Sequence, residues 1–205
     1  MQKKVHRDIR LVKIGKMKTY KIKKGWHTNF FSLKFYIMAF HLLLFTIFKN
    51  RKIVTTISFN SDALYDFGDD EDKDDWNKAF GVTLCAFARP NKNAVLMGWK
   101  SLPKERKIEI TPYFNKNFKR FTFNDFNVKL NIEEEYTFEI IPNKDNSWSI
   151  KMQDGRIKTF EYNFTPFIMR LIMPWFGGND TDKDGIGGTP NQDISYNIKY
   201  KITKK

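Results

Sequence analysis

The stretch Ser195-Tyr196-Asn197-Ile198-Lys199-Tyr200-Lys201-Ile202 alternates polar and apolar side chains from end to end. Successive side chains of a β-strand point to opposite faces of a sheet, so this stretch predicts a strand with one buried and one solvent-facing side. Strands with one wet face are typical of antiparallel sheets. We therefore expect at least one antiparallel sheet.

Nine further runs rich in Phe, Ile, Val, Tyr and Thr predict strands along the rest of the chain. They cover residues 53–59, 79–87, 94–99, 107–113, 118–123, 136–141, 148–152, 157–162 and 167–173. Turn residues such as Asn, Asp, Pro and Gly separate the runs at even spacing. The best helical candidate is a single turn over residues 74–78. The sequence thus predicts an all-β fold, an antiparallel two-sheet sandwich of jelly-roll (concanavalin A-like) architecture.

The charge of the chain is unevenly distributed. Its 205 residues carry a net charge of +13, yet residues 1–52 alone hold 14 Lys and Arg against one acid, so the remainder is neutral by count. A content of 41% hydrophobic and 16% aromatic residues suits one globular domain and excludes disordered or collagen-like classes. We expect a basic leader over residues 1–17 and one β-sandwich domain over residues 18–205. Nucleic acid or an anionic membrane would bind only through residues 1–52.

An apolar segment of 14 residues spans 35–48 between lysines. It is shorter than the roughly 20 apolar residues of a membrane helix, and no small-residue cleavage site follows it. We expect one long strand or a pair of buried strands here, with a membrane-associated segment or an uncleaved export signal as alternatives. A cytoplasmic or virion location is favoured over secretion. Cys85 is interpreted as a small buried hydrophobic residue.

Alternating aspartates mark the loop over residues 179–193 and predict a Ca²⁺ site. The candidate ligands are Asp180, Asp182, Asp184, the carbonyl of Ile186, and Asp193. Three carboxylates at alternate positions followed by Gly185 match the start of a calcium-binding loop. Asn191 stands where a bidentate Glu normally closes such a site, so Asp193 would replace that ligand. A polar loop held by Asx turns is the alternative for residues 179–193. The acidic stretch over residues 66–75 is interpreted as a solvated loop, with a cation site as its alternative.

Planar aromatic rings and side-chain amides near the predicted turns point to glycan recognition. A sugar ring has an apolar face and a rim of hydroxyl groups, which aromatic stacking and amide hydrogen bonds can hold. The candidate ligand-binding residues are Trp175, Asn77, Asn93, Asn179 and Trp99. A core position for Trp175 is the alternative. For hydrolysis, a carboxylate pair would have to come from among Asp62, Asp66, Glu109 and Glu139, and nothing in the sequence selects one.

Five short motifs stand at residues 21–25 (K-I-K-K-G), 75–81 (D-W-N-K-A-F-G), 93–99 (N-A-V-L-M-G-W), 174–179 (P-W-F-G-G-N) and 190–194 (P-N-Q-D-I). They resemble the patterns K-I-K-K-G, D-I-N-K-L-F-G-F, N-S-A-R-x-G-W, P-Y-F-G-G-N and A-P-H-D-I of a family of uncharacterised small proteins common in Bacteroidetes and their mobile elements. The resemblance covers residues 18–202. It implies a β-sandwich similar to lectin and glucanase folds, with no established activity.

The chain departs from that family at several positions. Leu96 replaces the arginine of the family's N-S-A-R-x-G-W motif, and Gln192 replaces the histidine of A-P-H-D-I. Residues 88–92 stand where the family often has a histidine cluster. The departures imply that a histidine-dependent metal or catalytic site is absent here, and that residues 180–189 are an addition. The leading hypothesis is a noncatalytic binding or structural module that recognises a glycan. One alternative is an assembly component of a phage particle or cell surface, which docks on a partner protein, nucleic acid or membrane through its basic N-terminus. A second alternative is a polysaccharide-active enzyme.

Overall fold

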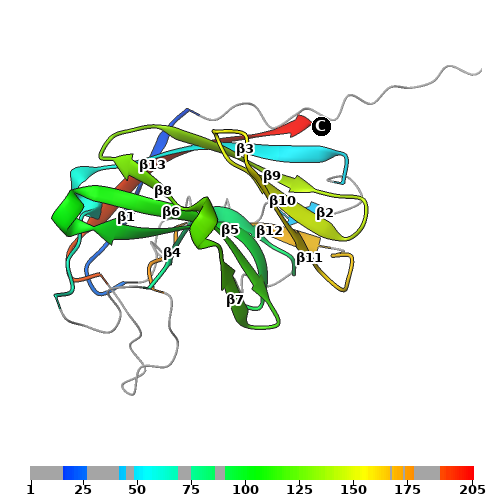
Figure 1. Ribbon diagram of the computed structural model, residues 1–205, viewed down its shortest axis with the longest axis horizontal. Helices are drawn as coiled ribbons and strands as arrows, with labels where there is room; N and C mark the ends of the chain where they lie inside the picture. Colours follow the sequence, from blue (N-terminus) through cyan, green and yellow to red (C-terminus); the bar gives the residue numbers. More distant parts are fainter. Residues whose placement is uncertain are drawn as a thin grey trace, which may run out of the picture.

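The computed structural model describes residues 16–26, 42–44, 49–68, 75–85, 91–166, 168–172, 174–177 and 190–205. Two antiparallel sheets pack against each other, and Figure 1 shows them as two layers. No α-helix occurs in the described ranges, which contain only strands, turns and three short 3-10 helices. The predicted all-β, jelly-roll sandwich is confirmed.

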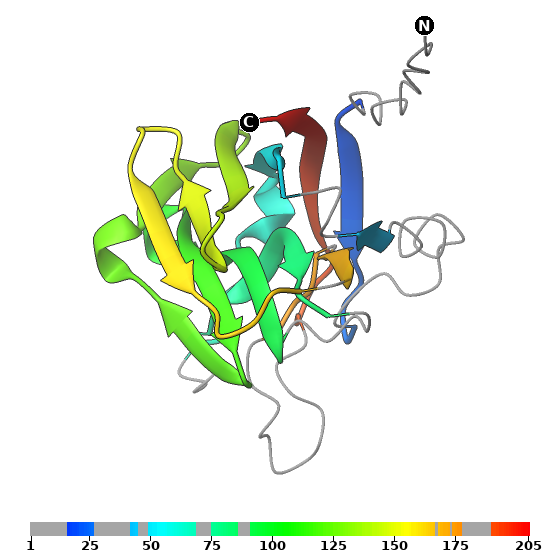
Figure 2. The same cartoon turned by 90° about the vertical axis from the view of Figure 1, so that its right-hand side faces the viewer.

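Six strands form the first sheet, which we call sheet A. Their order is β1 (Lys18–Ile22), β13 (Ile194–Lys204), β3 (Arg51–Phe59), β9 (Tyr136–Pro142), β10 (Ser147–Lys151) and β11 (Ile157–Glu161). β1 pairs with β13, so that Lys18 lies opposite Ile198. Figure 2 shows β1 in blue beside β13 in red at one edge of the molecule. Both ends of the described chain therefore meet in sheet A.

Seven strands form the second sheet, which we call sheet B. Their order is β2 (Leu42–Leu44), β12 (Ile168–Ile172), β4 (Asn77–Thr83), β5 (Asn93–Leu102), β6 (Lys107–Lys116) and β7 (Lys119–Thr122), with β8 (Val128–Asn131) paired to the first half of β6. The short helices are η1 (Ser61–Ala63), η3 (Pro103–Glu105) and η4 (Asn124–Phe126). In the described part of the chain, no helix is long and apolar enough to cross a membrane.

The core lies between the sheets and combines aliphatic side chains with a cluster of aromatic rings. Trp99 of β5 is fully buried, with its ring centroid 5.0 Å from Phe59 of β3 and 5.7 Å from Tyr196 of β13. Along β13, Tyr196, Ile198 and Ile202 are buried while Lys199 is exposed, as the alternating sequence predicts. Rings from both sheets thus interlock and fix how the two layers pack.

All ten predicted strands occur, with ends shifted by a few residues. The ten predicted strands did not include β1, β2 or β8, and the three short helices were not predicted. The helical turn expected over residues 74–78 is wrong, because Asn77 and Lys78 begin β4. Cys85 is partly exposed rather than buried, because it lies in a bend beyond the end of β4. Within residues 35–48, the described Leu42–Leu44 form β2, which agrees with the strand interpretation.

Candidate functional site

The face of sheet B that points away from the core carries a group of aromatic, charged and amide side chains. We call it the sheet B outer face. Its side chains are Trp76, Lys78, Lys100, Glu109, Tyr113, Asn115, Arg120 and Trp175. Strand register brings them together: Lys78 lies opposite both Gly98 and Trp175, and Gly98 lies opposite Thr111. Side chains directly opposite each other in an antiparallel pair share a face.

Gly98 allows two aromatic rings to lie against this face. A Cβ atom at Gly98 would stand 3.0 Å from Cδ2 of Tyr113 and 3.4 Å from a ring carbon of Trp76. The missing side chain therefore leaves the space that both rings fill. Trp76 and Tyr113 are only 6% and 2% exposed, so they form the floor of the sheet B outer face.

An ion pair lies next to the Trp76 ring. Nζ of Lys100 is 3.4 Å from Oε2 of Glu109, and the two residues are directly opposite on β5 and β6. The same Nζ lies 5.1 Å from the Trp76 ring centroid, within the range of a cation–π contact. The ring and the carboxylate together hold the Lys100 ammonium in place.

A second ion pair lies near Tyr113. Nη1 of Arg120 is 3.1 Å from Oδ1 of Asp75, and Arg120 lies directly opposite Asn115 on the neighbouring strand. Burial raises the pKa of Tyr113 above its ordinary value, although the positive charge of Arg120 acts in the opposite direction. The Tyr113 phenol therefore stays neutral near the Arg120 guanidinium.

Trp175 joins the sheet B outer face through its backbone. The N–H groups of Lys78 and Trp175 each donate to the other residue's carbonyl oxygen at 2.8 Å. Nζ of Lys78, a residue only 1% exposed, donates to the carbonyl oxygen of Gly177 at 2.9 Å and lies 5.9 Å from the Tyr113 ring centroid. Trp175 itself is partly exposed. Of the predicted ligand-binding residues that the structure describes, it is the one on this face.

Three other predicted ligand-binding residues are engaged inside the protein. Asn77, 2% exposed, donates from Nδ2 to the Tyr65 hydroxyl at 2.8 Å and accepts the Gly177 N–H at 2.7 Å. Asn93 accepts the N–H of Asn117 at 3.0 Å and so holds the turn between β6 and β7. Trp99 packs in the core and has no ring face open to a ligand. We correct the expectation for these three residues: each stabilises the fold.

The predicted calcium site falls almost entirely outside the described residues. Asn179, Asp180, Asp182, Asp184 and Ile186 lie there, and only Asp193 is described. Oδ1 of Asp193 accepts the backbone N–H of Lys24 at 2.9 Å, which ties the end of the loop to the turn after β1. Among the described residues, no three His, Cys, Asp or Glu side chains gather into a metal-binding group. Ca²⁺ binding stays a prediction.

The motifs behind the family resemblance meet in pairs. The motif at 75–81 contacts that at 174–179 through the Lys78–Trp175 and Asn77–Gly177 hydrogen bonds. The motif at 21–25 contacts that at 190–194, where the Gly25 N–H donates to the Pro190 carbonyl oxygen at 3.0 Å. These motifs therefore close the sandwich by joining segments that are distant in the sequence.

The four carboxylates considered for hydrolysis each have their own partner. Asp62 accepts from the N–H and hydroxyl of Ser195 at 2.9 and 2.6 Å, and Asp66 accepts the Gly68 N–H at 2.8 Å. Glu139 pairs with Lys52 on sheet A at 2.8 Å, whereas Glu109 lies on sheet B. Glu109 and Glu139 thus point away from opposite layers and cannot flank one substrate bond.

Sequence reasoning missed Lys100, Tyr113, Asn115 and Arg120, and it considered Glu109 only as a carboxylate for hydrolysis. A signal was present in β6, where Glu109, Tyr113 and Asn115 occupy alternate positions and must share one face. Their partners come from β5 and β7, so strand register was needed to see the group.

The sequence matches no model of a known protein family and no curated protein sequence. Chicken galectin 2 has a similar structure, with 9% identity and a TM-score of 0.37 over 71% of this chain and 88% of that one. Xenopus laevis galectin-Ib is 10% identical, with a TM-score of 0.37 over 81% of this chain and 97% of that one. An alginate lyase from Aplysia kurodai is 10% identical, with a TM-score of 0.39 over 91% and 82%. Similarity this distant transfers neither a ligand nor an activity to this chain, and the resemblance to the Bacteroidetes family stays a prediction.

Proposed function

We propose that this chain is a noncatalytic binding module that recognises a glycan on the sheet B outer face. One observation carries the proposal. Trp175, a partly exposed tryptophan, shares this face with two ion pairs whose charged groups keep contact with solvent. The side chains of Lys100 and Glu109 are 17% and 12% exposed, and those of Arg120 and Asp75 are 42% and 21% exposed.

Each part of this face suits one part of a sugar. An aromatic ring can cover the apolar face of a pyranose, and fixed cations and carboxylates can donate to and accept from its hydroxyl groups. In this proposal Trp175 supplies the ring and Lys100, Glu109 and Arg120 supply the polar contacts. The buried Trp76 and Tyr113 do not touch the ligand, and Trp76 positions Lys100 through its cation–π contact. Such positioning lowers the entropy lost on binding.

The carboxylates of this face favour binding over hydrolysis. Glycoside hydrolysis usually requires two carboxyl groups that flank one bond, one of them protonated. Here Glu109 and Asp75 instead form ion pairs with Lys100 and Arg120. The arrangement supports a surface that recognises hydroxyl groups without breaking a glycosidic bond.

A glycan array followed by calorimetry with the best-bound glycan tests the proposal. Trp175→Ala should weaken binding about tenfold or more, because losing an aromatic anchor costs roughly 1.4 kcal/mol or more. Lys100→Ala should also weaken binding while leaving the fold intact. Trp26→Ala is the matched control, because Trp26 is 45% exposed and lies beyond the turn that follows β1 of sheet A. The proposal fails if the parent protein binds no glycan, or if neither Trp175→Ala nor Lys100→Ala weakens binding.

A further inference from the structure

Three neighbouring strands of sheet A carry many basic residues and no acid. Residues 16–26, 49–59 and 194–205, which contain β1, β3 and β13, hold twelve Lys and Arg and no Asp or Glu. β13 lies between β1 and β3, and strand register places Lys21, Lys52, Lys199 and Lys201 on the outer side of these strands. We call these three segments the basic surface.

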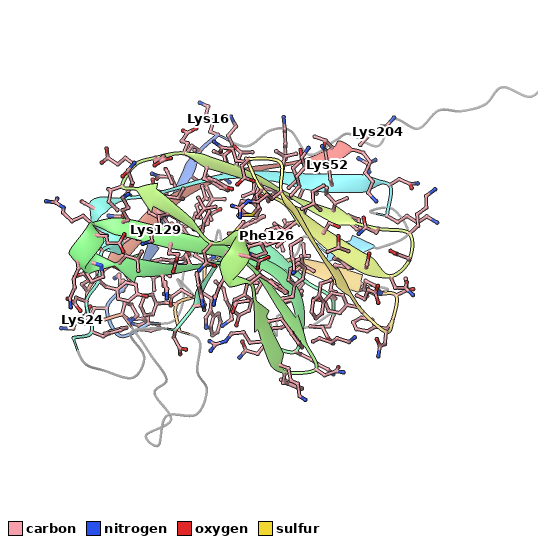
Figure 3. The ribbon with its side chains drawn as sticks, viewed as in Figure 1. Lys16, Lys24, Lys52, Phe126, Lys129 and Lys204 are labelled. Carbon is pink, nitrogen blue, oxygen red and sulfur yellow. The ribbon has the colours of Figure 1, made fainter. Side chains whose placement is uncertain are left out.

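Most of this charge faces solvent. Nine of the twelve basic residues are exposed, and Figure 3 shows Lys16, Lys52 and Lys204 along one side of the molecule. Among the residues that the structure describes, one ion pair forms on the basic surface, between Lys52 and Glu139 at 2.8 Å. The fold therefore leaves a strong positive potential along this side of sheet A.

Hydroxyl and amide groups accompany the lysines on the solvent-facing side of these strands. Lys199 lies opposite Thr56, and the Thr19 hydroxyl donates to Oδ1 of Asn197 at 2.7 Å. The aromatic residues of β13, Tyr196 and Tyr200, alternate with the lysines and point toward the core. The described strands β1, β3 and β13 project no aromatic side chain from their outer side, and the exposed aromatic of these segments, Trp26, lies beyond the turn that follows β1.

We infer that the basic surface binds a linear anionic polysaccharide, one that carries carboxylate or sulfate groups along its chain. Lysine ammonium groups match those anions, and the Thr and Asn side chains can both donate to and accept from sugar hydroxyls. The eleven residues of β13 extend over about 35 Å, which gives the surface an elongated shape suited to an extended polymer.

Other polyanions fit this surface less well. Single-stranded nucleic acid is usually held by several aromatic side chains on which successive bases stack, whereas the basic surface has one exposed aromatic among its described residues, Trp26. Sequence-specific recognition of a DNA duplex requires a helix or a two-stranded ribbon that enters a groove, whereas this surface is the face of a sheet. Peripheral membrane binding usually adds a row of apolar side chains that enter the lipid, and Trp26 is the one exposed large apolar side chain among the described residues of these segments. The basic surface belongs to sheet A, so it is separate from the sheet B outer face.

Binding measurements with the full chain test the inference. The ligands are polygalacturonate, heparin, duplex DNA and vesicles of phosphatidylserine and phosphatidylcholine, each at about 50 and about 150 mM salt. We expect polygalacturonate, heparin or both to bind more tightly than DNA or vesicles, with affinity that falls as salt rises. Tighter binding of DNA or vesicles at about 150 mM salt would overturn the inference, as would no binding of either polysaccharide at about 50 mM.

Charge-reversal variants locate the surface. Lys199→Glu with Lys201→Glu should weaken polysaccharide binding about tenfold or more, and Lys21→Glu should weaken it from the neighbouring strand. The matched control is Lys104→Glu with Lys119→Glu, which makes the same charge change at exposed positions on η3 and β7. Equal losses in the control and the β13 variant would overturn the inference. Trp175→Ala should leave this binding unchanged, which separates it from the proposed function.

Discussion

Two glycines decide how closely side chains and strands approach in sheet B. At Gly98 the space of a missing Cβ is filled by the side chains of Tyr113 and Trp76. At Gly81 the space is limited by the neighbouring strand, because a Cβ would lie 2.2 Å from the Val95 carbonyl oxygen and 2.8 Å from Cα of Leu96. A side chain can rotate away from a new methyl group, whereas a paired backbone can move only by disturbing the sheet.

Gly81→Ala should therefore destabilise the protein strongly. We expect the free energy of unfolding to fall by about 3 kcal/mol, at the upper end for overpacking, because β4 and β5 must separate locally. Gly98→Ala should cost about 1 kcal/mol, since its closest neighbours are the side chains of Tyr113 and Trp76. Urea denaturation of both variants measures the difference. Equal losses in the two variants would contradict this account.

The roles of individual residues were harder to predict from the sequence than the strands. Residues 93–99 of β5 are all buried, so both faces of this strand are covered and no alternation shows which side chains point to the core. Trp99 was therefore assigned to a ligand although it packs in the core. Trp175, by contrast, lies beside Lys78 through a backbone pairing between segments distant in the sequence. Position relative to the two sheets decides these roles, and local sequence does not encode it.

At the scale of elements, alternation and turn residues predicted the strands with one wet face. β13 and β9 show the pattern clearly, and both were found. The four-residue β8 is too short to show a period of two, and the five-residue β1 has only two apolar side chains. β1 becomes a strand because β13, at the other end of the chain, supplies its hydrogen-bonding partner. Pairing between distant segments is invisible to a local pattern.

The turn between β6 and β7 contains a strained residue. Asn117 and Phe118 have φ values of 51° and 65°, the left-handed region required of both central residues in a two-residue type I′ turn. Asn tolerates this region, but Phe does not adopt it readily. Phe118 is also 64% exposed, so little packing offsets the strain.

Phe118→Gly should consequently stabilise the protein. An Asn-Gly pair is preferred in a type I′ turn, and we expect a gain of about 0.5–1 kcal/mol in the free energy of unfolding after the higher entropy of glycine in the unfolded chain is counted. Thermal and urea denaturation would measure the gain. Phe118→Ala is the control, because alanine removes the ring but keeps the Cβ atom that causes the strain. If Phe118→Ala stabilises the protein as much as Phe118→Gly, strain at this turn is not the cause.

At the scale of the whole molecule, folding separates the charges further than the sequence count indicates. The four lysines of residues 194–205 join those near the N-terminus on the basic surface. Residues 53–193 then hold 18 basic against 22 acidic residues and carry the opposite net charge. The sequence located the basic excess in residues 1–52, but only the pairing of β1, β13 and β3 shows that the C-terminal strand extends it.

Burial of tyrosines is the other property of the whole fold. The seven tyrosines that the structure describes all have a pKa raised by burial, to about 12 for Tyr20 and Tyr65. In the unfolded chain these phenols ionise near pH 10. Between about pH 10 and 12 the native protein therefore holds more protons than the unfolded chain, and its stability falls as pH rises.

An alkaline titration that follows tyrosinate absorbance tests this consequence. At about pH 10, where the chain in denaturant is half ionised, the native protein should show little tyrosinate, followed by a steep rise as it unfolds near or above pH 12. Circular dichroism over the same pH range should lose the β-sheet signal together with that rise. The titration in denaturant is the control. If the native and denatured titration curves coincide at about pH 10, the tyrosines are not buried in the native protein, which would contradict the structure.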